Sequence, residues 1–522
     1  MFMNRLPFTS LQRLAALSAV VCAHAMLGLA DDKAGHVSYR EHGAAGDGVT
    51  DDFDAIIKAH DAANKANLPV RADKGATYYI GAAKKTAQIQ TDTDWGDAAF
   101  IIDDSNVTVE NRQSHIFHIA SRLPAAKMMT VKTLAKNEAK LDLSLDTPAF
   151  IVVTDSNVKR YIRYGANQNS GSAQTDVFVV AKDGRVDKTT PIIWDFERIT
   201  AMTAYPIDPV TLKVKGGRFT TIANQAESKY TYYSRGINIT RSNVVVDGLH
   251  HVVKGEGDHG APYGGFISVS TCTDITVQNC VLSGHKTYNT IGAANTKVSM
   301  GTYGISVNRA NNVTFKNCKQ ANDIHDGSRW GIFASNFSKN LTFDTVEFSR
   351  FDAHMGVVNA TIKNSVLGHQ GINLIGSGLF LIEKTKVCAG NFLNLRGDYG
   401  STWEGEFIIR DCAFLPRNGA PSDAVLLNGS YSGQHDFGYV CYMPRKITID
   451  GLTIHDANPP NNYSGPKIFG NFNGAFTSEV YVEKYPYVLT EEVVIKRLTV
   501  KSGKPPIVST NPFMFRNVKI TE

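Results

Sequence analysis

The feature that most constrains this sequence is a short strand-like segment that recurs along its C-terminal half. Ten segments, from "VVVDGLHH" around residue 247 to "FRNVKI" around residue 517, alternate apolar and polar residues. Consecutive aligned positions are 19 to 47 residues apart, and the shortest separations are close to 20 residues. A constant shortest separation with longer ones between other repeats indicates coils of constant size whose corners carry loops of different length. The sequence therefore predicts a parallel β-helix, in which each coil buries its inward side chains against its neighbours.

Each repeat has a polar or small residue just after its centre, and these residues should stack from coil to coil. Asn279 and Asn317 are expected to share side-chain hydrogen bonds at a turn. Cys280 and Cys318 follow them by one position and are expected to be buried, free thiols, because such stacking rarely gives the geometry of a disulfide. The aligned residues are Asp247, Asn279, Asn317, Thr345, Asn364, Lys384, Asp411, Asp450, Arg497 and Asn517.

Residues 1–30 are predicted to be a secretory signal peptide. Arg5 and Arg13 precede the short apolar run "LAALSAVVCAHAMLGLA", which is the usual arrangement of such a leader. The mature protein is therefore expected to be secreted or periplasmic. The whole sequence, leader included, has a formal net charge of +5 at pH 7, which is too small to indicate a nucleic-acid partner. Residues 31–522 contain no apolar run long enough to predict insertion into a membrane.

The segment "HGAAGDGVTDDFDAIIKAHDAANKAN" follows the leader and carries a turn and then an amphipathic stripe. It resembles the N-terminal signature of the pectate-lyase-like superfamily of right-handed parallel β-helices. In that superfamily the segment is a helix that caps the solenoid. The resemblance implies an all-β fold and an action on polysaccharides. It does not imply one reaction, because the superfamily includes lyases, hydrolases and phage tailspikes.

The chain divides into four parts on these grounds. Residues 1–30 are the leader, and 31–124 are expected to form the cap and the first coils. Between 125 and 224, runs such as "AFIVVTD" and "DVFVVAKDG" alternate with turn residues, which predicts an inserted β-rich subdomain. Residues 225–522 are expected to form the main β-helix with a catalytic groove, since long loops on a rigid scaffold often carry function.

The octapeptide "SRFDAHMG" places Arg350, Asp352 and His354 at alternate positions. In an extended segment these three side chains face the same side. Counted from the aligned residues, other basic side chains fall at similar distances in neighbouring coils. Because stacked strands lie about 4.8 Å apart, these side chains would form a strip about 15 to 20 Å long. The strip comprises Lys254, His285, His325, Arg350, His354 and His369.

Such a strip is complementary to an acidic polysaccharide, and uronic-acid polymers are the natural candidates. They can be cleaved by β-elimination, in which a base removes the C5 proton beside the carboxylate while the bond to O4 breaks. The carboxylate must be neutralised, because negative charge develops next to it. The catalytic candidates are Arg350 and Arg329 for neutralisation, and His354, His325 and His285 as the base.

Further residues are expected to bind the substrate. Tyr288 and Tyr399 are candidates for the acid that protonates O4, and Asp352 for a group that orients Arg350 or His354. The segment "NLRGDYGSTWEG" combines a cation with aromatic rings that can stack on sugars, which is consistent with a subsite. Packing of Trp403 in the core or at its edge fits the sequence equally well. The substrate-binding candidates are Lys254, Tyr288, Asp352, His369, Arg396, Tyr399 and Trp403.

Two other functions stay open. A hydrolase needs two carboxylic acids on either side of the scissile bond, and Asp323 with Asp326 is the best pair between residues 250 and 400. A non-catalytic carbohydrate-binding protein or adhesin would depend more on aromatic surfaces. The sequence demands no cofactor, but calcium stays open, because a metal can also neutralise a carboxylate. The carboxylates of "DTDWGD", residues 92–97, lie outside the strip and are expected in a turn.

Overall fold

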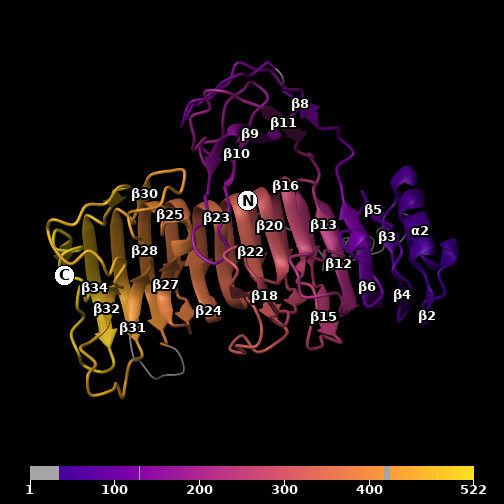
Figure 1. The fold of residues 1–522 in the computed structure, drawn as a ribbon. Helices are drawn as coiled ribbons and strands as arrows, with labels where there is room; N and C mark the ends of the chain where they lie inside the picture. The colour runs from indigo at the N-terminus through magenta and orange to yellow at the C-terminus, as the bar shows by residue number, and fades with distance from the viewer. Residues whose placement is uncertain (1–34, 129, 417–423) are drawn as a thin grey trace, which may run out of the picture.

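The computed structural model describes residues 35–128, 130–416 and 424–522. The expected signal peptide lies outside these residues. In the described part, 27 strands form one continuous sheet whose strands pair in parallel, and the sheet winds along the molecule coil by coil (Figure 1). The predicted all-β fold, a parallel β-helix, is therefore confirmed. No described helix has the length and apolar character needed to cross a membrane.

The longer strands of this sheet are joined by turns and loops and, in some coils, by strands of only two residues such as those at 281–282 and 319–320. Their side chains alternate between the core and the surface, as expected for strands with one buried face. The long strands are β6 (Thr93–Asp103), β12 (Leu212–Ile222), β16 (Gly264–Gln278), β20 (Tyr303–Lys316), β22 (Phe333–Asp344), β23 (Glu347–Lys363), β24 (Val366–Leu374), β25 (Gly376–Glu383), β27 (Asn391–Leu395), β28 (Trp403–Phe414), β31 (Lys446–Ile454) and β34 (Glu492–Val500).

The aligned polar residues of the repeat mark a left-handed turn between strands. Asn279, Asn317 and Thr345 have φ values of 55°, 51° and 58°, and asparagine tolerates this conformation better than most residues. Asn317 donates to Asn279 at 2.7 Å, as predicted. In two coils the turn residue is the glycine after the predicted aspartate, Gly248 or Gly451. These ladders fix the register of one coil on the next.

The interior of the β-helix is filled by stacked apolar side chains. Aromatic rings follow one another along the axis, with Phe333 and Phe351 stacked at 5.6 Å between centroids. Cys280 and Cys318 are buried on adjacent coils as free thiols. Their thiols contact backbone carbonyls, Cys318 at 3.4 Å from Val277. This packed core makes the scaffold rigid.

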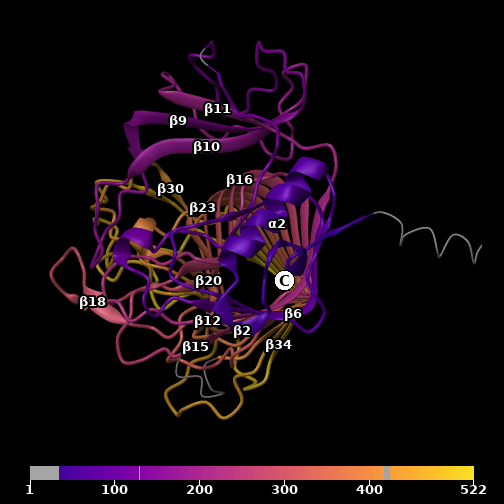
Figure 2. The same cartoon turned by 90° about the vertical axis from the view of Figure 1, so that its right-hand side faces the viewer.

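An α-helix, α2 (Phe53–Ala66), covers the N-terminal end of the solenoid, as the superfamily resemblance implies (Figures 1 and 2). It buries Phe53, Ile56 and His60 against the first coils. The carboxylate of Asp52, just before the helix, accepts hydrogen bonds from the backbone of Ala45 and Gly46 at 2.6 and 3.1 Å. The glycine-rich turn is thereby tied to the helix start.

An antiparallel four-stranded sheet stands beside the β-helix (Figure 2). It consists of β8 (Ala126–Lys127), β9 (Ala149–Arg160), β10 (Ser172–Val180) and β11 (Ala201–Pro206). It has its own apolar core, which includes Ile151, Phe178 and Met202. β12 pairs in parallel with β6 and β14 (Val244–Asp247), so this strand belongs to the β-helix although it lies within residues 125–224.

Candidate functional site

A cavity of about 880 Å³ opens between the β-helix and two excursions from it. Its floor comes from β16, β20, β22 and β23, and its walls from the loop 161–171 and from a hairpin at 289–299. A cavity of this size is in the range of small-ligand sites. The described lining consists of Arg163, Asn167, Tyr230, Tyr232, Gly264, Ile291, Ala293, Val298, Ser299, Gly301, Tyr303, Ser306, Trp330, Ala334, Asn336, Arg350, His354, Met355 and Arg396.

The floor of the cavity is organised around the carboxylate of Asp352, which is fully buried. Arg350 Nη2 lies 2.9 Å from one of its oxygens, and Arg396 Nη1 lies 3.0 Å from the other. Arg396 also contacts Asp398 at 2.8 Å, and Arg163 from the loop 161–171 contacts the same oxygen at 2.8 Å. Three guanidinium groups from distant parts of the chain therefore share two carboxylates.

Arg350 and Arg396 retain unused hydrogen-bond donors. Nε and Nη1 of Arg350, and Nε of Arg396, are buried and have no acceptor in the described chain. Buried donors without acceptors are costly, so such a group calls for a partner. The ring of Trp330 covers the Arg350 guanidinium at 5.0 Å. Gly331 makes room for the Arg350 side chain, because a Cβ there would collide with its methylene carbons.

His354 lies beside this cluster at the cavity surface. Its Nδ1 is 3.0 Å from Asn336 Oδ1, which can only accept, so Nδ1 carries the proton. Nε2 keeps its lone pair and accepts a longer hydrogen bond from Tyr399 at 3.3 Å. Burial, together with the charges of Arg396 and Arg163, holds the pKa of His354 well below its usual value. The imidazole is therefore neutral at pH 7 and can act as a base.

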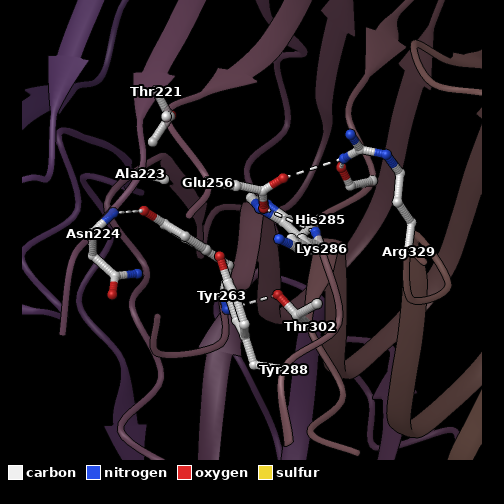
Figure 3. A network of polar contacts seen from close by, with 12 residues as sticks. Thr221, Ala223, Asn224, Glu256, Tyr263, His285, Lys286, Tyr288, Thr302 and Arg329 are labelled. Carbon is white, nitrogen blue, oxygen red and sulfur yellow. Dashed lines mark hydrogen bonds and ion pairs between the residues drawn. The ribbon is translucent and has the colours of Figure 1, made fainter. Parts of the chain in front are cut away.

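A second group of predicted residues forms a network around Glu256, which Figure 3 shows. The Glu256 carboxylate contacts His285 Nδ1 and Arg329 Nη1, both at 3.2 Å, and accepts from the Lys286 backbone at 2.9 Å. Burial alone would raise the pKa of Glu256, but the contacts with His285 and Arg329 outweigh it and lower this pKa below its usual value. Tyr263 stacks on His285 with 4.4 Å between ring centroids.

The Glu256 network supports the cavity from behind. Trp330 donates its backbone N–H to the carbonyl of His285 at 3.0 Å, and its indole reaches Arg350. His369 also contacts the segment that leads to Trp330, because its ring nitrogens lie 2.9 and 3.2 Å from the carbonyls of Ile324 and Arg329. These contacts fix the segment that carries Trp330.

The structure thus divides the predicted site residues, both those of the strip and the other candidates. Arg350, Asp352, His354, Arg396 and Tyr399 come together at the cavity, although Tyr399 itself is buried and does not line it. His285, Arg329, Tyr288 and His369 do not line the cavity but support its wall. His325 and Lys254 are exposed elsewhere. The expectation of one continuous strip is wrong, because corner loops of unequal length turn these side chains in different directions.

Trp403 requires a further correction. It was expected to form a sugar subsite, but its ring is fully buried in the β-helix core, and Nε1 donates to the carbonyl of Gly378 at 3.0 Å. Phe380 and Phe407 pack against it at 5.6 and 5.3 Å. Trp403 is therefore a core residue.

Several cavity residues are not among the sequence candidates. Arg163 and Asn167 belong to the inserted segment, far from the repeat, and no periodicity connects them to the site. Tyr303 and Trp330 stand out in the sequence only as aromatic residues of the groove loops. Burial and Asp352 raise the pKa of Tyr303, while Arg350 and Arg396 work in the opposite direction. Its phenol therefore keeps its proton at neutral pH.

The residues present do not fit a calcium ion. Calcium needs six to eight oxygen ligands, with carboxylates among them. No described residue of the cavity lining is Asp or Glu, and the nearby Asp352 and Asp398 are paired with arginines. Nowhere among the described residues do three His, Cys, Asp or Glu side chains gather as metal ligands would. The segment "DTDWGD" was expected in a turn, but from Thr93 on it lies in strand β6, and Asp92 and Asp94 accept hydrogen bonds from backbone N–H groups.

The chain resembles bacteriophage tailspikes in its fold. The tailspike gp61 of Pseudomonas phage phi297 is 11% identical, with 90% of this chain and 83% of that chain covered and a TM-score of 0.54. The Gp54 tailspike of Acinetobacter baumannii bacteriophage AP22, solved in complex with A. baumannii capsular saccharide, is 9% identical, with 93% and 79% covered and a TM-score of 0.50. Neither a sequence family nor a curated protein matches the chain. These likenesses show the fold alone. They support the resemblance to the pectate-lyase-like superfamily only as a parallel β-solenoid.

The Asp352 cluster predicts a large loss of stability in the Asp352→Asn variant. The substitution leaves Arg350 and Arg396 buried without their shared countercharge, and breaking a buried pair in this way costs about 3–5 kcal/mol. Denaturant unfolding measures the change. The Asp411→Asn variant is the control, because Asp411 forms an exposed pair with Arg497 whose loss should change stability by about 1 kcal/mol or less. Equal losses in the two variants would contradict the role assigned to Asp352.

Proposed function

We propose that this protein is a secreted lyase that cleaves a uronic-acid-containing polysaccharide, of the glycosaminoglycan or alginate and pectin type, by β-elimination. One observation carries the proposal: three arginines and a neutral histidine line the cavity, and no described lining residue is acidic. Within the floor cluster, three guanidinium groups face two carboxylates, which leaves a net positive charge. A bound anion would complete this cluster.

The substrate carboxylate would take up the unused donors of Arg350 and Arg396. Arginine suits this task, because its planar donors match a carboxylate in pairs. Neutralisation makes the C5 proton more acidic and stabilises the charge that develops at the carboxylate. The aromatic rings of Tyr230, Tyr232 and Trp330 in the lining are suited to stack on sugar rings.

The elimination can then be written with the groups at the cavity. Nε2 of His354 takes the C5 proton, replacing its 3.3 Å contact with Tyr399. The electron pair of the C5–H bond forms a C4=C5 double bond, and the C4–O4 bond breaks. Tyr303 gives its phenolic proton to O4. His354 then releases the C5 proton to water, and Tyr303 regains a proton from water. One product carries an unsaturated uronate at its end, and the other has a new reducing end whose anomeric hydroxyl contains the former O4.

The alternatives fit this cavity less well. A hydrolase needs one carboxylic acid as a proton donor and a second carboxylate on the other side of the bond. Among the described residues the lining contains no carboxylic acid, and Asp326, one of the pair expected from the sequence, is bound to Ser328 and Arg329. A non-catalytic binding protein stays an alternative, and the AP22 tailspike complex with capsular saccharide supports polysaccharide binding on such a scaffold.

The test is incubation with alginate, polygalacturonate, hyaluronan and chondroitin sulfate. A lyase produces a C4–C5 double bond that absorbs in the ultraviolet. The His354→Ala variant should lose about 10²–10⁴-fold in kcat/KM, the usual contribution of a general base. The His325→Ala variant should keep full activity, because His325 is exposed away from the cavity. New reducing ends without ultraviolet absorbance would indicate a hydrolase, and full activity of His354→Ala would remove the assigned base.

The low pKa of His354 predicts the pH dependence. The free imidazole is the active form, so activity should be constant near pH 7 and fall only below the usual histidine pKa of about 6.5. Asn336→Asp places a carboxylate on Nδ1, which raises the pKa of His354 and should move the acid limb of kcat/KM to higher pH. Asn308→Asp adds the same charge one coil away, in register with Asn336, and should shift it less. An unchanged limb in Asn336→Asp would contradict the assignment.

A further inference from the structure

The cavity is bridged by two segments that leave the β-helix in different places. The loop 161–171 connects β9 and β10 of the inserted sheet and descends across the strands of the solenoid (Figure 1). The hairpin of β18 (Asn289–Ile291) and β19 (Lys297–Ser299) rises from the other side. Ala294 N donates to the carbonyl of Ala166 at 3.1 Å, so the two segments are directly joined. We call the loop and the hairpin together the bridge.

The bridge is anchored at both ends of the cavity. At one end, Arg163 pairs with Asp398, and the backbone of Tyr164 donates to the carbonyl of the same residue at 3.0 Å. At the other end, Tyr230 donates its hydroxyl to Asn167 at 3.3 Å. Tyr161, at the root of the loop, packs against Phe337 and Tyr439. The loop therefore spans the site from the coil of Asp398 to the edge near Tyr230.

The junction between loop and hairpin is tight. A Cβ built on Gly292 would lie 2.6 Å from the carbonyl oxygen of Ala166 and 2.8 Å from Asn167 Oδ1. Both distances are too short for any side chain. Gly292 is therefore needed for the close approach, since its φ lies outside the left-handed range in which glycine would be needed for its own conformation.

We propose that the bridge makes this protein act on chain ends, a proposal that rests on the lyase function above. A polymer can enter an open groove at any point along its length. A groove closed from side to side admits only a chain that is threaded from its end. The bridge supplies Arg163, Asn167, Ile291 and Val298 to the same cavity that His354 lines from the floor. The substrate class is thus the terminal units of an acidic polysaccharide, released as short products.

The test compares wild type with Gly292→Val, whose side chain should separate the hairpin from the loop. Tyr230→Phe is the second variant, because it removes the Asn167 contact without adding volume. Gly327→Val is the matched control, since a Cβ at Gly327 meets nothing within 4 Å. Each is assayed on alginate, polygalacturonate and hyaluronan, as intact polymers and as trimer to hexamer fragments, by solution viscosity, product size and tryptophan fluorescence on binding.

Wild type and Gly327→Val should release short products from the start with little loss of viscosity. Their binding per uronate unit should weaken as chains lengthen, because ends become rarer. Gly292→Val and Tyr230→Phe should lower viscosity severalfold more per bond cleaved and lose the dependence of binding on length. Rapid loss of viscosity with the wild type would overturn the bridge proposal and leave the lyase intact. Binding of the polymers without an ultraviolet-absorbing product would overturn the lyase function. The dependence of binding on chain length would then still decide the role of the bridge. If the protein neither binds nor cleaves any of these polymers, both the lyase function and the role of the bridge are overturned.

Discussion

The buried carboxylate of Asp352 is the interaction on which the site depends. It draws Arg350 from its own strand and Arg396 from two coils further along the solenoid to one point on the floor of the cavity. Isolated guanidinium groups would not stay in such a poorly hydrated place, because burial of an unpaired charge is too costly. One carboxylate for two arginines holds them there and still leaves donors free for a ligand. The positive character of the cavity follows from this imbalance.

The coils themselves impose the positions of these residues. Asp352 pairs in register with Asn373, which receives a hydrogen bond from Asn394 at 2.9 Å, and Asn394 receives one from Asn428 at 3.2 Å. A column of amides thus continues from the floor cluster along the solenoid. Such ladders resist a shift of one coil against the next, since each amide is both donor and acceptor. The geometry of the cavity floor is therefore as rigid as the core beneath it.

The repeat made the fold predictable, and its loops limited what could be predicted of the site. The turn residues Asn279, Asn317 and Thr345 were identifiable because a left-handed turn restricts which residues occur there. Arg350, Asp352 and His354 were identifiable because one strand carries all three. The prediction failed for site residues that loops separate from this strand, because His285 and Arg329 turn toward Glu256 instead of the cavity. Trp403 shows a different limit, because an aromatic residue next to a loop can equally well fill the core.

The inserted sheet explains why part of the site has no trace in the repeat. Arg163 lies almost two hundred residues before Arg350 in the sequence, yet both line the same cavity.

The most direct test of the account is a crystal structure of the His354→Ala variant with a trisaccharide of uronic acid. The account predicts that a carboxylate of the sugar accepts hydrogen bonds from Arg350 or Arg396, with its C5 proton directed at the space left by the imidazole. A sugar bound outside the cavity, or with its carboxylates directed into solvent, would contradict it.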